Sequence, residues 1–264
     1  MTLHSTIAMS LVGKRALITG AGRGIGRAMA QICAQEGASV AICARTSSEL
    51  EETLSSLPSN IKSSKEMYVV DLTDESQVEN MVHQVVDKWG GIDILINNAG
   101  RGSKKGLVTE LKSSELRDVL DLNIVSVHSV TSAVLRMAMK KQKSGRIINI
   151  SSRAAKIGIP QMSFYVASKF ALEGYSSVLA HECKDDNIIV NTISPGKVDT
   201  TSFPKSKGSQ GVRTAESIKD GLMLLLQTEK TGHYLHVDEL DMVREKGLDD
   251  SLALKPIDEP TFAV

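Results

Sequence analysis

The stretch RALITGAGRGIGRAMA at residues 15–30 decides the fold, because it reads in direct succession as a β-strand, a glycine-rich turn and the start of a helix. Its four glycines permit positive φ and let a pyrophosphate approach the main chain, and the helix N-terminus offers unpaired N–H groups to phosphate. The pattern is T-G-x-x-x-G-x-G, since Ile25 stands where the commoner G-x-G-x-x-G has its third glycine. The stretch predicts a dinucleotide-binding turn, with a structural turn that holds no ligand as the alternative.

Short β-branched runs alternate with longer segments of helical period along almost the whole chain. Such alternation is typical of βαβ units on a parallel sheet, and the nearly continuous apolar runs are typical of strands covered by helices on both faces. Strands are expected at residues 15–18, 39–43, 67–70, 92–96, 146–150, 188–193 and 234–237. We therefore predict an α/β fold, with one doubly wound, seven-stranded parallel sheet flanked by helices.

Several helix boundaries can also be predicted from the sequence. Asp74, with Gln77 three residues later, forms a capping-box pattern, and Thr214 is a candidate cap for the last helix. Between residues 113 and 143, apolar residues recur at helical spacing. This pattern predicts one long helix with a buried stripe.

Composition restricts the class of protein. The 264 residues are 41% apolar, and 31 Lys plus Arg balance 31 Asp plus Glu, so no net charge would draw the chain onto nucleic acid or anionic lipid. Cys33, Cys43 and Cys183 are too scattered for a disulfide framework and are expected to be buried. His233 and His236 fall on opposite faces of a strand, so no metal site is expected.

The chain is expected to form one domain, since it shows no internal repeat and no linker. Residues 1–10 are interpreted as an N-terminal extension, residues 11–240 as the catalytic domain and residues 241–264 as a C-terminal tail. Residues 1–10 lack the charged start and apolar run of a signal peptide, and no run of 18 apolar residues follows. We therefore expect a cytoplasmic protein without a membrane partner.

The end of the second expected strand favours the phosphorylated cofactor. About 20 residues beyond such a turn, an NAD-binding domain has an Asp or Glu that takes the ribose hydroxyls, but Ala44 and Arg45 stand here. Arg45, with Arg23 inside the turn, offers forked donors suited to a phosphate dianion, which a carboxylate would repel. NADP(H) is predicted over NAD(H), and a surface arginine without a ligand is the alternative for either residue alone.

Tyr165 and Lys169 are spaced for proton transfer. Their i,i+4 spacing in a helical segment places them on one face. Because a nearby ammonium stabilises a phenolate, Lys169 is expected to lower the pKa of Tyr165 from its usual value near 10. Upstream, Ser152 follows the strand at residues 146–150, and ligands of parallel sheets bind at such strand ends. These three residues are the candidate catalytic group.

Taken together, these motifs resemble the short-chain dehydrogenase/reductase family in order and spacing. The residues that carry the resemblance are Thr19 to Gly26, Asn97-Asn98-Ala99-Gly100, Asn123, Ser152, Tyr165, Lys169 and Pro195-Gly196. The resemblance extends from about residue 11 to residue 238 and implies a Rossmann-like domain with an Asn-Ser-Tyr-Lys tetrad. In this chain the tetrad would be Asn123, Ser152, Tyr165 and Lys169.

The resemblance also implies a role for each member of the tetrad. Tyr165 would protonate a substrate carbonyl as hydride arrives from the nicotinamide, and Ser152 would hydrogen-bond the same oxygen. Lys169 would hold the nicotinamide ribose, and Asn123 would anchor a water in the proton path. Donors placed around a developing alkoxide are what carbonyl reduction needs.

By the same resemblance, a wider set of residues is expected to bind the cofactor. Asp71 and Leu72 would contact adenine, Asn98 would support the sheet, and Val198 and Thr200 would hold the carboxamide. The complete expected set is Gly20, Arg23, Gly24, Ile25, Gly26, Arg45, Asp71, Leu72, Asn98, Ala99, Gly100, Tyr165, Lys169, Pro195, Gly196, Val198 and Thr200. A homodimer or homotetramer is expected through the long helix and the helix after Tyr165, with Val166, Phe170 and Leu172 as apolar material.

The substrate stays open at this stage, beyond a small carbonyl or alcohol compound. The segment at residues 201–214 stands at the place of the family's substrate lid. It is shorter than that lid usually is and contains three basic residues. Lys104, Lys105, Lys156 and Lys197 stand on segments that could also border the cleft. An anionic substrate and ordinary surface lysines both explain this. The leading hypothesis is an NADPH-dependent ketone or aldehyde reductase; the alternatives are a 3-oxoacyl-carrier-protein reductase and an NADPH-binding redox sensor without turnover.

Overall fold

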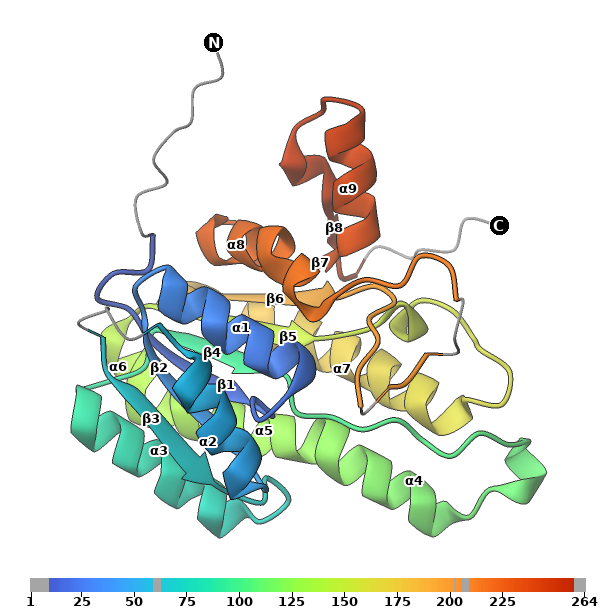
Figure 1. Cartoon of the computed structure of the whole chain (residues 1–264), viewed down its shortest axis with the longest axis horizontal. Coiled ribbons are helices and arrows are strands. Elements are labelled where there is room, and N and C mark those ends of the chain that lie inside the picture. The colour runs from blue at the N-terminus through green and yellow to red at the C-terminus, as the bar shows by residue number, and fades with distance from the viewer. Residues whose placement is uncertain (1–9, 59–62, 202, 206–208, 259–264) are drawn as a thin grey trace.

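The structure is a computed structural model that describes residues 10–58, 63–201, 203–205 and 209–258 (Figure 1). Its centre is an eight-stranded sheet in the order β3-β2-β1-β4-β5-β6-β7-β8. The strands are β1 (Arg15–Thr19), β2 (Ser39–Ala44), β3 (Lys65–Val69), β4 (Ile94–Asn97), β5 (Gly145–Ile150), β6 (Ile188–Ser194), β7 (His233–His236) and β8 (Leu254–Pro256). The first seven pair in parallel, as predicted, and β8 is antiparallel to β7.

The eighth strand was not predicted, and it comes from the segment interpreted as a C-terminal tail. Leu254 lies opposite Leu235 and Pro256 opposite His233. Proline, which has no N–H to donate, is tolerated in such an edge strand. Helix α9 (Val237–Glu245) precedes this strand, so the boundary set at residue 240 passes through a helix.

Helices cover both faces of the sheet (Figure 1). On one face, α1 (Gly24–Gln35), α2 (Ser47–Ser56), α8 (Lys219–Gln227) and α9 contribute to one hydrophobic cluster. On the other face, α3 (Glu75–Trp89), α5 (Ser126–Val134) and α7 (Ser163–Glu182) contribute to a second. Successive residues of β1 alternate between the two, since Ile18 belongs to the first cluster and Leu17 to the second.

The predicted long helix is confirmed, but it is not uniformly α-helical. The run Ser113–Gln142 consists of α4 (Ser113–Leu120), a π-helical segment (Asp121–Val125), α5, a second π-helical segment (Leu135–Met139) and α6 (Lys140–Gln142). The run is long and apolar enough to cross a membrane by composition, yet 56% of its most apolar window is buried inside the fold. Pairs such as Val130 and Val134 pack into the second cluster, as in the core helix of a globular domain.

The expected helix caps are only partly formed. Asp74 caps α3 by accepting from the N–H groups of Ser76 and Gln77. The reciprocal bond of a capping box is replaced, because Gln77 accepts from the N–H of Asp71 instead, at 3.0 Å. Thr214 precedes a 3₁₀ turn (Ala215–Ile218) without a side-chain cap bond. The other 3₁₀ turns are Val108–Glu110, Arg153–Ala155, Lys184–Asp186 and Asp250–Ala253.

Candidate active site and cofactor groove

The glycine-rich turn between β1 and α1 is closed tightly by the end of β4. Gly20 and Gly24 adopt φ values of 63° and 55°, which favour glycine. A Cβ atom at Gly26 would overlap the carbonyl oxygen of Gly20 and lie 2.5 Å from the amide nitrogen of Asn98. That amide donates to the carbonyl oxygens of Thr19 and Gly20, at 2.9 Å each. The turn therefore leaves its outer face free for a ligand while Asn98 fixes it from beneath.

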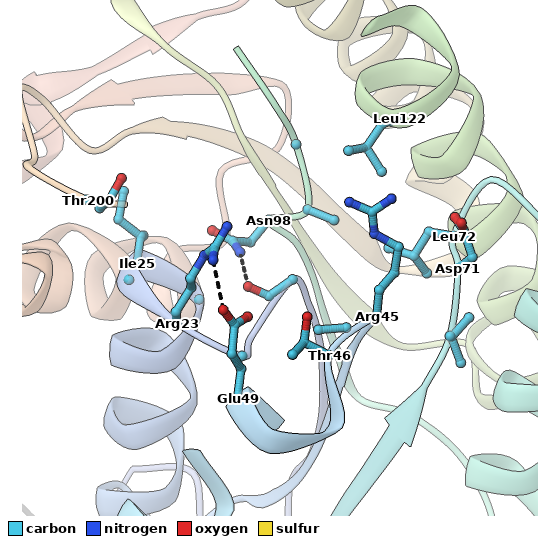
Figure 2. A pocket seen from close by; sticks show the side chains of 18 of the residues that line it. Arg23, Ile25, Arg45, Thr46, Glu49, Asp71, Leu72, Asn98, Leu122 and Thr200 are labelled. Carbon is cyan, nitrogen blue, oxygen red and sulfur yellow. Dashed lines mark hydrogen bonds and ion pairs between the residues drawn. The ribbon is translucent and has the colours of Figure 1, made fainter. Parts of the chain in front are cut away.

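A cavity opens over this turn, at the carboxyl ends of β1, β2, β3 and β4 (Figure 2). Twelve of the predicted cofactor residues line it: Gly20, Arg23, Gly24, Ile25, Gly26, Arg45, Asp71, Leu72, Asn98, Ala99, Gly100 and Thr200. The strand order reverses between β1 and β4, and in open α/β sheets ligands bind at such a point.

A second cavity continues from the first. Its lining contains the other five predicted cofactor residues together with the third catalytic candidate: Tyr165, Lys169, Pro195, Gly196, Val198 and Ser152. Ile25, Asn98, Gly100, Thr200 and Phe203 line both cavities, so the two form one groove. Ser152, Tyr165 and Lys169 thus share a cavity, whereas Asn123, the fourth predicted catalytic residue, lines neither of the two.

Tyr165 stands in the first turn of α7 and is almost fully buried. Burial raises the pKa of its phenol, and hydrogen bonding with Ser152 lowers it only in part. The expectation that the pKa of Tyr165 lies below its usual value is therefore wrong for this structure. The reason is that withdrawal from water penalises the phenolate more than its neighbours stabilise it.

Lys169 is tied to the strand that precedes Ser152. Its Nζ donates to the main-chain oxygen of Ile150 at 2.8 Å and lies 5.8 Å from the centre of the Tyr165 ring. Burial lowers the pKa of Lys169 to about 8, while the charge of Glu173, one helical turn further along α7, acts in the opposite direction. The lysine is thus mostly protonated at neutral pH, close to the point where it would lose its charge.

Asn123 lies in the first π-helical segment of the long helix, and such segments are frequent at functional sites. Its amide oxygen accepts from the N–H of Arg101 at 2.9 Å, and its nitrogen donates to the Arg101 carbonyl and to Ser168 Oγ at 3.0 Å each. Ser168 in turn donates to the carbonyl of Tyr165 at 2.8 Å. Asn123 thereby joins the loop after β4 to α7, and the water implied by the resemblance stays a prediction.

The two arginines predicted to bind a 2′-phosphate do not converge. Figure 2 shows their guanidinium groups well apart, with Arg23 pointing to Glu49. Arg23 Nη1 and Glu49 Oε1 form an ion pair of 2.7 Å. The exposed Arg45 lies close enough to Asp71 to help lower the pKa of that carboxyl, which is held down mainly by hydrogen bonds from Thr73. Glu49, which was not in the predicted set, belongs to the site because it lines the cavity and pairs with Arg23.

Other residues that were not predicted also line the groove. The Phe203 ring lies 5.6 Å from the Tyr165 ring, where the two cavities join. Among the described residues, the cations that line the catalytic cavity are Arg101, Arg153, Lys169 and Lys205. Of the predicted lid, residues 202 and 206–208 lie outside the described residues.

Three of the four lysines that could border the cleft outside the lid have other contacts, and none of the four lines either cavity. Lys104 lies 4.0 Å from Glu115, and Lys197 donates to the carbonyl of Gln210. Lys156 lies 3.3 Å from the buried Glu173. In the ranges that the structure describes, no group of three or more His, Cys, Asp or Glu side chains is arranged to hold a metal ion.

Comparison with known sequences supports the resemblance found in the motifs. A family profile described as short chain dehydrogenase matches residues 14–210. The 3-oxoacyl-[acyl-carrier-protein] reductase of Vibrio cholerae is 33% identical over 213 residues, which cover 81% of this chain and 85% of that protein. The enzyme of the same name from Thermotoga maritima is 38% identical over 197 residues, which cover 75% and 79%.

Solved structures are similar over most of their length. An NAD⁺-bound xylitol dehydrogenase superposes with a TM-score of 0.78 at 30% identity, covering 86% of this chain and 98% of that one. A short chain dehydrogenase from Burkholderia cenocepacia in complex with NADP gives a TM-score of 0.78 at 29% identity, covering 86% and 97%.

Proposed function

Since the chain belongs to the short-chain dehydrogenase/reductase family, whose members act on CH–OH and C=O groups, we propose that it reduces a ketone or aldehyde with NADPH. One observation carries the proposal. Ser152, Tyr165 and Lys169 line a cavity that is continuous with the cavity over the glycine-rich turn. A substrate carbonyl beside Tyr165 would therefore lie next to the reactive end of a dinucleotide in the groove.

The glycine-rich turn fits the phosphates of a dinucleotide. Gly20, Gly24 and Gly26 have no Cβ atoms, which leaves the main chain of the turn accessible to phosphates. Helix α1 begins at Gly24, so its N-terminus faces the same place. The adenosine end would lie against Asp71 and Leu72, and the nicotinamide end beside Lys169, with Val198 and Thr200 near its carboxamide. When bound, NADPH supplies the hydride.

Tyr165 is proposed as the general acid. Burial raises the pKa of its phenol, so it keeps its proton at neutral pH and can give it to the carbonyl oxygen as the alkoxide develops. Ser152 would donate to the same oxygen and stabilise its charge. The ammonium of Lys169, fixed to Ile150, would hold the cofactor ribose and attract the electrons left on the tyrosine oxygen.

The preference for NADP(H) over NAD(H) is supported by the local chemistry. Arg45 and Arg23 line the adenosine end of the groove, and no carboxylate stands at Ala44. One of the similar structures is a complex with NADP and another is bound to NAD⁺, so the family uses both. The deciding measurement is the rate of NADPH oxidation, monitored by absorbance, with a panel of carbonyl compounds. The same panel is measured with NADH for comparison.

A second candidate function is reduction of a 3-oxoacyl group on a carrier protein. Relatives at 33% and 38% identity bear that name. Arg101, Arg153 and Lys205 give the catalytic cavity cations that suit an anionic substrate. The panel should therefore include a 3-oxoacyl thioester; NADPH binding without turnover of any carbonyl would instead support the redox sensor.

We also propose a homodimer or homotetramer in a reducing, cytoplasmic compartment. Val125 of the long helix and Phe170 and Val178 of α7 are exposed apolar side chains on the expected surface. Leu172, expected to contribute, is instead buried within the chain.

The cysteines fit a reducing compartment. All three are free and buried as predicted, and burial raises the pKa of Cys33 and Cys43 to about 12, which makes these two thiols unreactive.

A further inference from the structure

The groove contains an acidic residue, Glu49, beside Arg23, one of the two arginines predicted to bind a 2′-phosphate. Glu49 lines the cavity together with Arg23, and the two form an ion pair of 2.7 Å (Figure 2). We propose that Glu49 sets the cofactor preference by competing with the 2′-phosphate of NADP(H) for Arg23. The inference rests on the proposed function, because it assumes that a dinucleotide occupies this groove.

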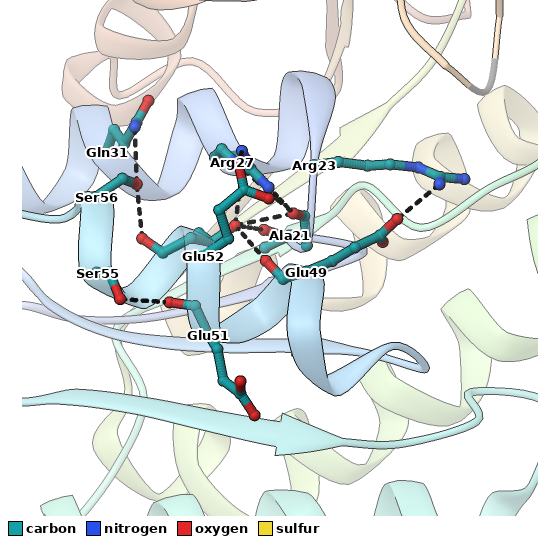
Figure 3. Close-up of polar contacts among 11 residues, drawn as sticks. Ala21, Arg23, Arg27, Gln31, Glu49, Glu51, Glu52, Ser55 and Ser56 are labelled. Carbon is teal, nitrogen blue, oxygen red and sulfur yellow. Dashed lines mark hydrogen bonds and ion pairs between the residues drawn. The ribbon is translucent and has the colours of Figure 1, made fainter.

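Helix α2, which carries Glu49, is fastened to the glycine-rich turn (Figure 3). The buried Thr53 hydroxyl lies 2.9 to 3.0 Å from the carbonyl oxygens of Ala21, Gly22 and Glu49. From α1, Arg27 donates to Thr53 Oγ1 at 2.9 Å and to the Gly22 carbonyl at 2.6 Å. The main chain of Glu49 is therefore held in place, and its carboxylate can leave Arg23 only by rotation of the side chain.

The carboxylate also lies directly against the turn. A Cβ atom at Gly22 would meet the Cβ of Glu49 at 3.0 Å and its Oε2 at 3.1 Å. The negative charge thus lies beside the main chain that a cofactor must approach. A 2′-phosphate bound to Arg23 would either displace this carboxylate or lie close to it, and like charges repel.

The charges that line this cavity balance. Arg23 and Arg45 are positive, and Glu49 and Asp71 are negative. The ribose hydroxyl of NAD(H) is neutral and meets no repulsion here, whereas the phosphate dianion of NADP(H) does. Glu49 therefore narrows the preference for NADP(H) that the two arginines create.

The size of the effect follows from exposure. The side chains of Arg23 and Glu49 are 46% and 28% exposed, so solvent screens their interaction. Removing the negative charge should strengthen NADP⁺ binding by about threefold to tenfold. NAD⁺ binding should change by less than about twofold, because it lacks the phosphate.

The test is calorimetric binding of NADP⁺ and NAD⁺ to the full-length protein, its Glu49→Gln variant and the matched control Glu52→Gln. Glu52 stands on the same helix and pairs with Arg27 at 2.7 Å, but it does not line the cavity. We expect Glu49→Gln alone to bind NADP⁺ more tightly. The fragment 2′,5′-ADP should gain as NADP⁺ does, and 5′-AMP should not.

Unchanged or weaker binding of NADP⁺ and 2′,5′-ADP by Glu49→Gln would overturn the inference, the weaker case meaning that Glu49 orients Arg23 for the phosphate. An equal gain in Glu52→Gln would also overturn it, because general loss of negative charge would explain both. Failure of the unmodified protein to bind either dinucleotide would reject the proposed function as well. Glu49→Ala provides a second variant, judged by the same criteria.

Discussion

The ammonium of Lys169 donates to the carbonyl of Ile150 at 2.8 Å, which joins the helix of the candidate acid to the strand that leads to Ser152. Because both residues are buried, the bond is protected from water. The relative position of Tyr165 and Ser152 thus depends on a lysine that the family resemblance assigns to the cofactor. Loss of Lys169 should therefore disturb both catalysis and cofactor binding.

Replacing Tyr165 with Phe should separate binding from catalysis. The change keeps the ring and its packing but removes the proposed proton donor, so turnover should fall by about 10²–10⁴-fold. NADPH binding, measured by calorimetry, should remain within a few-fold of the parent. Carbonyl reduction by Tyr165→Phe at the parental rate would show that another group is the acid.

The pH dependence of reduction should reflect Lys169. Burial lowers the pKa of this lysine to about 8, so its charge is complete well below pH 8 and is lost as the pH rises through that value. Turnover should decline over the same range, because an uncharged lysine cannot stabilise the tyrosine oxygen. Tyr165, whose pKa is raised above its usual value, would titrate at higher pH.

Glu173→Gln should move this alkaline limb to lower pH. The charge of Glu173 raises the pKa of Lys169, so its removal lets the lysine lose its proton sooner. The measurement is the pH profile of kcat at saturating substrate, with a thermal melt at each pH to confirm folding. A Glu173→Gln variant that stays folded and keeps the parental profile would refute this coupling.

Arg45→Ala should weaken the preference for NADPH over NADH by about tenfold to a hundredfold, if this residue binds the 2′-phosphate. The ratio of kcat/KM for the two cofactors measures it. Comparable efficiency with NADH in the unmodified protein would contradict the assignment to NADPH.

Gly26→Ala should abolish dinucleotide binding and destabilise the fold by about 1–3 kcal/mol, because the new Cβ would overlap the Gly20 carbonyl oxygen. Gly174→Ala is the matched control within a helix. A Cβ there has nothing within 4 Å, so the substitution should stabilise the fold by up to about 1 kcal/mol. Denaturant unfolding measures the change in stability of each variant, and calorimetry measures dinucleotide binding. Equal changes in stability would count against the close approach at Gly26.

Assembly can be tested at Val178, an exposed apolar residue of α7. The parent protein should sediment as a dimer or tetramer, and Val178→Glu should sediment as a smaller species because a charge would be buried in the interface. Val69→Glu, on the exposed side of β3, serves as the control. A parent that is monomeric at micromolar concentration would reject the proposed assembly.

Much of this fold is predictable because its signals are local and repeated. The seven parallel strands are apolar runs, and their ends differ from the prediction by at most two residues. Strand β8 gave no such signal, since its three residues, with a lysine and a proline, are too few for a pattern.

The site divides in the same way. The motif residues that line the groove could be located from sequence, because short turns and strand ends place them. The pairing of Arg23 with Glu49 could not, since it depends on how α2 packs on the turn. The raised pKa of Tyr165 likewise follows from burial by residues distant in sequence.

The two hydrophobic clusters differ in when a growing chain can complete them. The cluster packed under α3, α5 and α7 ends with Val190, whereas the cluster under α1 and α8 runs from Leu11 to Leu254. During synthesis on the ribosome, the first of these layers has all its residues while much of the C-terminal part is still untranslated. The face of the sheet that carries α1 must wait for nearly the last codons before its hydrophobic surface is covered.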